Sequence, residues 1–187
     1  MAVADTLTVI RSLFHPHKIQ PCIDGSLIIK EIDRRASMKL VKLDSVGASA
    51  FAMEYDGCKF PGESLFAPAH ALHRACDSIA FCVVDGKPFI MCFELKSSEP
   101  DRTEVAEQFR NAHCFLDYLG SLLANYFKCD PIQTWPRRYF VFHNQGETLA
   151  KRASREEYDN DTPERAHFFA VQNGKKIFMR EILGKPQ

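Results

Sequence analysis

The chain has 187 residues, of which 45% are hydrophobic and 26% charged, and its 24 basic and 24 acidic side chains give a formal net charge of zero. This length and composition are typical of one globular domain with a full hydrophobic core. A neutral chain lacks the basic excess of a free-standing nucleic-acid-binding protein, so any such binding is expected to depend on a local basic patch or on partner subunits.

The cysteines indicate a reducing compartment. There are seven, scattered along the chain, and no Cys-x-x-Cys pair occurs. Most lie in apolar runs, which is typical of reduced core residues in a cytosolic protein. The first residues lack the basic and apolar segments of a secretory signal, and no apolar run approaches the length of a membrane span. We therefore expect a cytoplasmic protein that does not cross a membrane.

The first part of the chain predicts one helix and a set of short strands. Apolar residues at helical spacing predict a helix over 6–14, with Asp5 as its cap and Pro16 beyond its end. Alternating polar and apolar residues then predict three strands that form an antiparallel meander. These strands cover residues 26–32, 38–43 and 49–55.

A possible transition-metal site precedes the centre of the chain. His70, His73 and Cys76 follow one another at steps of three, so they would lie on one face of a helix. Imidazole and thiolate groups are zinc ligands, but no fourth ligand is evident. Packing or solvent-facing histidines are the simpler interpretation.

The stretch 75–98 predicts a β-hairpin with an unusual pair of charges. Two apolar runs flank Asp85-Gly86, a dipeptide typical of two-residue type I′ turns, in which both residues have positive φ. This turn pairs the two strands so that Asp77 lies directly opposite Glu94. Lys96 follows two residues after Glu94 and therefore lies on the same face.

Two opposed carboxylates need a partner. Directly opposed side chains are about 5 Å apart, where two carboxylates repel by roughly 3 kcal/mol. The neighbouring residues are apolar, so water is not expected to relieve the repulsion. A bound Mg²⁺ or Mn²⁺ would offset it, and the ammonium of Lys96 would do so in part. The alternative is a buried ion pair of Lys96 with one of the acids in an inert sheet.

Asp77 and the tripeptide Glu94-Leu95-Lys96, separated by a hairpin, resemble the motif of the PD-(D/E)XK nuclease superfamily, although Cys76 stands where the family name has Pro. The resemblance implies an α/β fold with a mixed sheet, built on a restriction-endonuclease-like αβββαβ core. Residues 61–187 of a single nuclease domain would form this core. Residues 1–60 would add the N-terminal helix and the β-meander as an extension.

The same resemblance implies a metal-dependent phosphodiesterase. Asp77, Glu94 and the main-chain carbonyl of Leu95 would hold Mg²⁺ or Mn²⁺, and Lys96 would lie beside the attacking water. Some members also carry an acidic residue on a preceding helix, for which Glu63 is the nearest counterpart.

The segment after the hairpin predicts a long helix over 102–127. Asp101 and Glu104 resemble a capping box, and apolar residues then recur at three and four positions. Gln108 lies at the edge of this apolar stripe. Several nuclease subfamilies carry a glutamine here that reaches the site, so the resemblance makes Gln108 an auxiliary catalytic residue. Otherwise it is a boundary polar residue.

The remaining elements complete an α/β pattern. Residues 138–143 predict a buried strand, and 151–164 a charged surface helix and loop. Asn173-Gly174 predicts a second hairpin, between 167–171 and 176–182. Basic residues of this region either contact a phosphate backbone or are scattered surface charges, namely Arg137, Arg138, Lys151, Arg152 and Arg155.

Together these features predict a nuclease with DNA as its substrate and RNA as the alternative. Its neutral charge suits an effector subunit of an antiviral-defence or DNA-processing complex, delivered by protein partners or acting as a homo-oligomer. A catalytically silent subunit that binds nucleic acid or protein is one competing hypothesis. A cysteine hydrolase built on Cys76 or Cys82 with a histidine is another.

Overall fold

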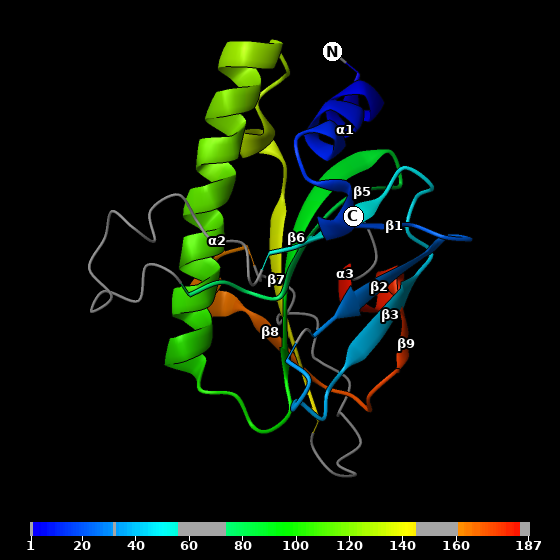
Figure 1. Ribbon diagram of the computed structural model, residues 1–187, viewed down its shortest axis with the longest axis vertical. Helices are drawn as coiled ribbons and strands as arrows, with labels where there is room; N and C mark the ends of the chain where they lie inside the picture. The colour runs from blue at the N-terminus through cyan, green and yellow to red at the C-terminus, as the bar shows by residue number, and fades with distance from the viewer. Residues whose placement is uncertain (1, 32, 56–73, 145–160, 184–187) are drawn as a thin grey trace.

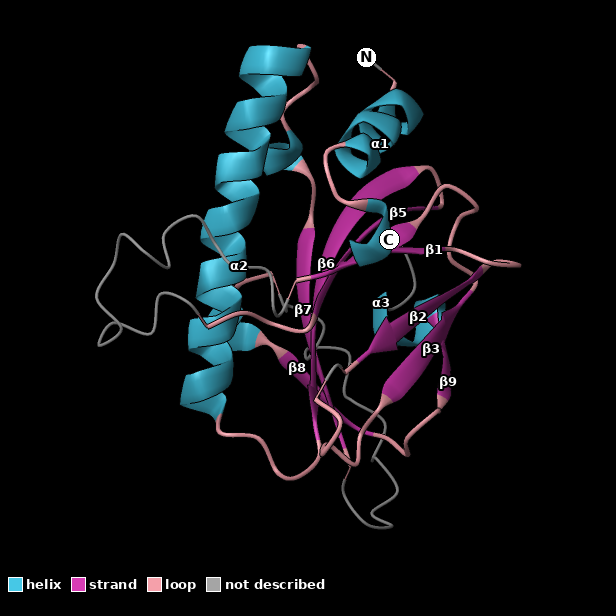
Figure 2. Cartoon of the chain, in the orientation of Figure 1, coloured by secondary structure: helices cyan, strands magenta, loops and turns pink. Residues whose placement is uncertain are grey.

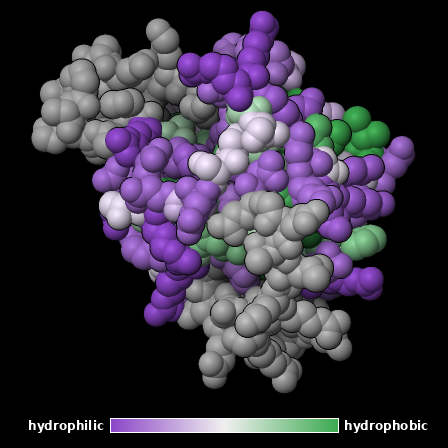
Figure 3. Space-filling view, turned by 90° about the horizontal axis from the view of Figure 1, so that it is seen from below, coloured by the Kyte–Doolittle hydropathy of each residue, from purple (hydrophilic) through white to green (hydrophobic). Residues whose placement is uncertain are grey.

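The computed structural model describes residues 2–31, 33–55, 74–144 and 161–183. A long helix covers one face of a six-stranded mixed sheet, and a small three-stranded sheet lies on its other side (Figures 1 and 2). The face seen in Figure 3 is mainly hydrophilic, with small hydrophobic areas between the polar side chains. No described helix combines the length and the apolar character that a membrane span requires.

The large sheet is antiparallel from β1 to β6 and parallel from β6 to β8. Its strands, in spatial order, are β1 (Ile19–Pro21), β4 (Phe51–Glu54), β5 (Ser78–Val84), β6 (Lys87–Lys96), β7 (Arg137–His143) and β8 (His167–Ala170). The small sheet consists of β2 (Ser26–Lys30), β3 (Leu40–Asp44) and β9 (Lys176–Phe178). The α-helices are α1 (Val3–Ser12), α2 (Arg102–Leu122) and α3 (Met179–Leu183). Shorter helical turns are Pro16–Lys18, Leu123–Phe127, Ile132–Thr134 and Pro163–Arg165.

The hairpin prediction is confirmed. Asp85 and Gly86 have φ values of 51° and 76°, as a type I′ turn requires. Val84 pairs with Lys87, and the pairing continues to the end of β5. One further step in this register places Asp77 opposite Glu94, so the sheet brings the two acids together.

Replacing Gly86 by alanine should test how much the positive φ at this turn matters for the stability of the protein. A Cβ at Gly86 would meet nothing within 4 Å, so the expected cost comes only from the positive φ. An L-residue in the left-handed region costs about 1 kcal/mol, and asparagine tolerates it better. We expect Gly86→Ala to lower the free energy of unfolding by about 1 kcal/mol in urea denaturation, and Gly86→Asn to lower it less. Equal stability of both variants and the wild type would show that the turn is not strained.

Two hydrophobic cores lie on opposite faces of the large sheet, and successive side chains of β6 and β7 point alternately into one core and the other. Cys92 and Tyr139 belong to the core under α1 and α2. Phe93 and Phe140 belong to the core under the small sheet. The helix prediction is confirmed, because α2 buries its apolar stripe against the first core and Asp101 caps it by accepting hydrogen bonds from two main-chain N–H groups of the first turn.

The predicted meander is wrong. β2 and β3 do pair antiparallel, but the other neighbour of β3 is β9. β4 instead joins the large sheet between β1 and β5. Phe51, Ala52 and Met53 are all buried, so β4 is a two-sided interior strand, and its alternation is not that of a solvated meander. Residues 1–60, which were expected to form an extension, therefore contribute β1 and β4 to the large sheet.

Two further local predictions are wrong. Gly174 has the expected positive φ of 77°, but β8 and β9 enter different sheets instead of pairing. The side chain of Asn173 accepts hydrogen bonds from the main chain of Lys39 and Leu40, which ties this turn to the start of β3.

Asp5 does not cap the first helix as predicted, because α1 begins after Ala2 and Asp5 lies within its first turn. The predicted helix within 151–160 lies outside the described residues.

Candidate active site

The candidate site lies where β5 begins, β6 ends and α2 starts its second turn, in the lower part of Figure 1. Asp77 immediately precedes β5, and Glu94 and Lys96 are near the end of β6. Side chains alternate along β6, and Cys92 faces the core under α2, so Glu94 and Lys96 face α2 as well. This face brings them to Gln108.

The two acids contact each other through the main chain. The Asp77 N–H donates to Glu94 Oε2 at 3.2 Å, and the Leu95 N–H donates to Asp77 Oδ2 at 2.6 Å. Both side chains are buried, with Asp77 5% and Glu94 3% exposed. Each carboxylate thus accepts a hydrogen bond from the opposite strand, which offsets part of the repulsion expected from the sequence.

Two further side chains bind Glu94. Lys96 Nζ lies 2.8 Å from Glu94 Oε1 and 3.5 Å from Glu104 Oε1. Gln108 Nε2 donates to Glu94 Oε1 at 3.0 Å and to the carbonyl of Ala75 at 3.1 Å. Gln108 thus contacts Glu94, while its role as an auxiliary catalytic residue stays a prediction.

Glu104 is the residue of this cluster that sequence reasoning missed. Its only predicted role was in the cap of α2, but its carboxylate is the second acid near Lys96. Glu104 and Gln108 are four residues apart on one helix and therefore lie on the same side. That spacing could have placed Glu104 at the site once Gln108 was a candidate.

Burial dominates the electrostatics of the cluster. It raises the pKa of Glu94 to about 7, although Lys96, Gln108 and the Asp77 N–H all favour the charged form. Burial also lowers the pKa of Lys96, but the attraction of Glu94, Glu104 and Asp77 outweighs it, so the net pKa is raised. Lys96 is thus positively charged at neutral pH, and Glu94 holds its proton more tightly than an ordinary glutamate.

The donor set fits a hard divalent cation. Mg²⁺ commonly binds one or two carboxylates and keeps several of its waters. Asp77 and Glu94 supply two carboxylates, and no described group of three His, Cys, Asp or Glu side chains is placed to hold a metal. Gln108 Oε1 is buried without a hydrogen-bond partner among the described residues, and a metal-bound water would donate to such an acceptor. The role of the Leu95 carbonyl as a ligand stays a prediction.

The cysteine hypothesis does not agree with the structure. Cys76 and Cys82 are fully buried. Burial raises the pKa of Cys82 to about 12 and that of Cys76 well above its ordinary value, which disfavours the thiolate that a nucleophile needs. Glu63, His70 and His73 lie outside the described residues, and their predicted roles stay predictions.

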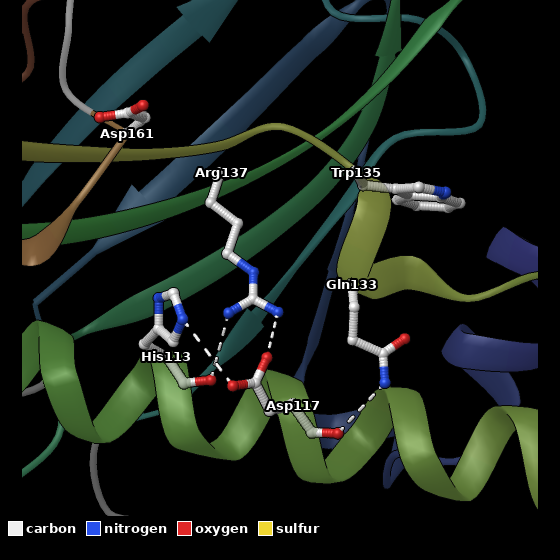
Figure 4. Close-up of a pocket in the computed structure, with 6 residues that line it drawn as sticks. All are labelled: His113, Asp117, Gln133, Trp135, Arg137 and Asp161. Carbon is white, nitrogen blue, oxygen red and sulfur yellow. Dashed lines mark hydrogen bonds and ion pairs between the residues drawn. The ribbon is translucent and has the colours of Figure 1, made fainter.

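A polar cavity of about 250 Å³ lies farther along α2 (Figure 4). Arg137 is only 7% exposed and binds Asp117 through Nη2 at 2.5 Å, so it is not a scattered surface charge, and its predicted contact with a phosphate backbone stays a prediction. Arg137 is the register partner of Ile90 on β6, and Ile90 lies four residues before Glu94 on that strand. The cavity is therefore separate from the candidate site. The cavity is lined by His113, Asp117, Gln133, Trp135, Arg137 and Asp161.

The structure brings together four of the side chains that the sequence singled out: Asp77, Glu94, Lys96 and Gln108. Asp77 immediately precedes β5, Glu94 and Lys96 are on β6, and Gln108 is on α2, where Glu104 joins them. Comparisons of this chain with protein-family models, with curated proteins and with solved structures find no match.

Proposed function

We propose that this protein is a divalent-metal-dependent nuclease that hydrolyses phosphodiester bonds, with DNA as its substrate. The observation that carries the proposal is the cluster of three buried side chains, Asp77, Glu94 and Gln108, with the half-buried Lys96. Burying two facing acids costs free energy, so such pairs are rare in a protein interior. Carboxyl groups whose pKa is strongly shifted, as that of Glu94 is, typically occur at functional sites.

The order of elements around the cluster supports a restriction-endonuclease-like core. Helix α1 and strand β4 come before the β5–β6 hairpin, and α2 and β7 come after it. β4, β5 and β6 are antiparallel neighbours, and β7 adds parallel to β6 after the α2 crossover. If β1, β2 and β3, which lie between α1 and β4, are treated as an insertion, this is the αβββαβ order of the PD-(D/E)XK resemblance. Its first helix and first strand then come from residues 1–60, which were expected to form the extension, and not from 61–187.

Each residue of the cluster has a distinct part in this proposal. Asp77 and Glu94 would hold Mg²⁺ or Mn²⁺, which when bound activates water and neutralises charge on the phosphate. The Lys96 ammonium orients the water and the scissile phosphate. Gln108 fixes the orientation of the Glu94 carboxylate through its 3.0 Å hydrogen bond. Hydrolysis then joins the water oxygen to phosphorus as the bond to the leaving oxygen breaks.

One observation favours the competing function, a catalytically silent subunit that binds nucleic acid or partner proteins. Glu94 already accepts hydrogen bonds from Lys96, Gln108 and the Asp77 main chain. Such a cluster is compatible with a stable fold without any cation. In both functions, we propose that protein partners or further copies of the chain deliver this neutral protein to DNA.

A cleavage assay should decide between the two functions. Plasmid, single-stranded DNA and RNA are incubated with Mg²⁺ or Mn²⁺, and with EDTA. We expect wild-type cleavage only with the metals, and a loss of about a hundredfold in Asp77→Asn, Glu94→Gln and Lys96→Met, the scale seen when a transition-state charge loses its partner. Glu107→Gln is the matched control, since Glu107 lies on α2 but binds Arg74.

Cleavage that survives all three substitutions would exclude this site as the active site. If the wild type binds nucleic acid but cleaves none of the substrates, the silent-subunit function is supported instead.

A further inference from the structure

His143 lies beside the candidate site on the next strand. It is the last residue of β7 and the register partner of Lys96 in the parallel β6–β7 pair. Partners in such a pair point to the same face, and Tyr139 and Val141 on β7 face the core under α2. His143 therefore lies on the face of Glu94 and Lys96. Its partner on β8 is Ala170, which has no polar side chain.

The imidazole of His143 is buried without its full set of hydrogen bonds. The residue is 7% exposed, and Nδ1 is buried with no hydrogen-bond partner among the described residues. Leaving a buried donor or acceptor unpaired costs about 1–3 kcal/mol, so such atoms are rare without a reason. A ligand atom within hydrogen-bond reach of Nδ1 would supply the missing partner.

The chemistry of the two side chains points to the kind of ligand. Burial lowers the pKa of His143, with Glu99 opposing it, which favours the neutral ring that carries one N–H. Lys96 adds a positive charge one strand away. A positive charge beside a neutral N–H donor suits an anionic oxygen. Because Glu94 and Glu104 also surround Lys96, such an anion needs a divalent cation to offset their charge.

We infer that His143 is a further substrate-binding residue, which together with Lys96 binds one phosphate group of the nucleic acid across the ends of β6 and β7. This inference rests on the proposed function in its choice of ligand. It adds a contact on the β7 side of the site, away from the Asp77–Glu94 pair.

Binding of a fluorescein-labelled single-stranded DNA, measured by anisotropy with Ca²⁺ or with EDTA, tests the inference. Asparagine places its amide the same number of bonds from Cα as Nδ1, whereas glutamine places it at the distance of Nε2. We expect His143→Gln to weaken binding in Ca²⁺ about tenfold, as for a lost hydrogen bond to a charged group, and His143→Asn to retain most of it. His167→Gln is the matched control, because His167 pairs with Phe140 and faces the core under the small sheet.

A double-mutant cycle and NMR sharpen the result. If Lys96 and His143 bind the same phosphate, the losses of Lys96→Met and His143→Gln should not add. DNA should also shift the Nδ1 resonance of His143 but not that of His167. Thermal unfolding of each variant confirms that it is folded.

The outcomes separate this inference from the proposed function. If wild type cleaves DNA and His143→Gln binds DNA equally well, the inference is wrong and the nuclease function stands. If the wild type binds DNA through His143 but cleaves nothing, the inference stands and the nuclease function fails. A wild-type protein that binds no DNA contradicts both.

Discussion

Replacing Lys96 with methionine should make the stability of the protein fall steeply above pH 7. The substitution keeps most of the volume of the side chain but removes the charge that lies 2.8 Å from Glu94 Oε1. Glu94 is 3% exposed, so ionising it without Lys96 would leave an unpaired buried charge. The carboxyl avoids this by keeping its proton, and its pKa rises further in the variant.

The sign of the effect follows from proton binding. The pKa of Glu94 is about 7 in the folded protein and 4.5 in its ordinary state, so the folded protein holds the proton more tightly. The stability that Glu94 contributes is therefore complete below pH 4.5 and is lost as the pH rises to about 7, at about 1.4 kcal/mol per pH unit. In the wild type, the free energy of unfolding stops falling above about pH 7. In Lys96→Met it continues to fall, and by pH 9 we expect the variant to be destabilised by about 3 kcal/mol more than the wild type.

Urea denaturation between pH 5 and pH 9 measures this difference. Lys87→Met is the matched control, since Lys87 begins the same strand but is exposed at the turn. The double variant Glu94→Gln/Lys96→Met should lose the steep fall above pH 7, because it has no buried carboxyl to ionise. A parallel pH dependence of Lys96→Met and wild type would mean that Glu94 is not held in a buried ion pair.

The part of the site that could be predicted from sequence is the part determined by local chemistry. Asp85-Gly86 requires positive φ at both positions, and a two-residue turn leaves one register for the strands. That register alone places Asp77 opposite Glu94 and leaves Lys96 on the same face. The amphipathic stripe of α2 predicts in the same way that Gln108 lies at its buried edge.

The remainder depends on contacts between distant segments. Nothing local to β4 distinguishes a meander strand from an interior strand of the large sheet, since its place depends on pairing with β1 and β5. The parallel pairing of β3 with β9 joins residues more than a hundred positions apart. His143 could be recognised only after α2 had returned the chain beside β6, because its relation to Lys96 is a register between non-consecutive strands.

Divalent cations should stabilise the protein in a pH-dependent way. A ligand that binds only the folded state raises the free energy of unfolding by about 4 kcal/mol when its concentration is a thousand times its Kd. Because Asp77 and Glu94 would both have to be ionised, the cation must displace the proton from Glu94, whose pKa is about 7. Below pH 7 each pH unit should weaken binding about tenfold. The gain from saturating Mn²⁺ should therefore be about 2 kcal/mol larger at pH 8 than at pH 5.5.

Urea denaturation with Mn²⁺ and with EDTA at the two pH values measures the gain. Glu94→Gln should abolish it, because the amide cannot replace the charged ligand. Glu104→Gln should retain it, since Glu104 contacts Lys96 but lies outside the proposed ligand set. An equal gain at both pH values would place the ion elsewhere on the protein. No gain at either pH would favour the silent subunit, in which Lys96, Gln108 and the Asp77 N–H compensate the buried charge of Glu94 without a cation.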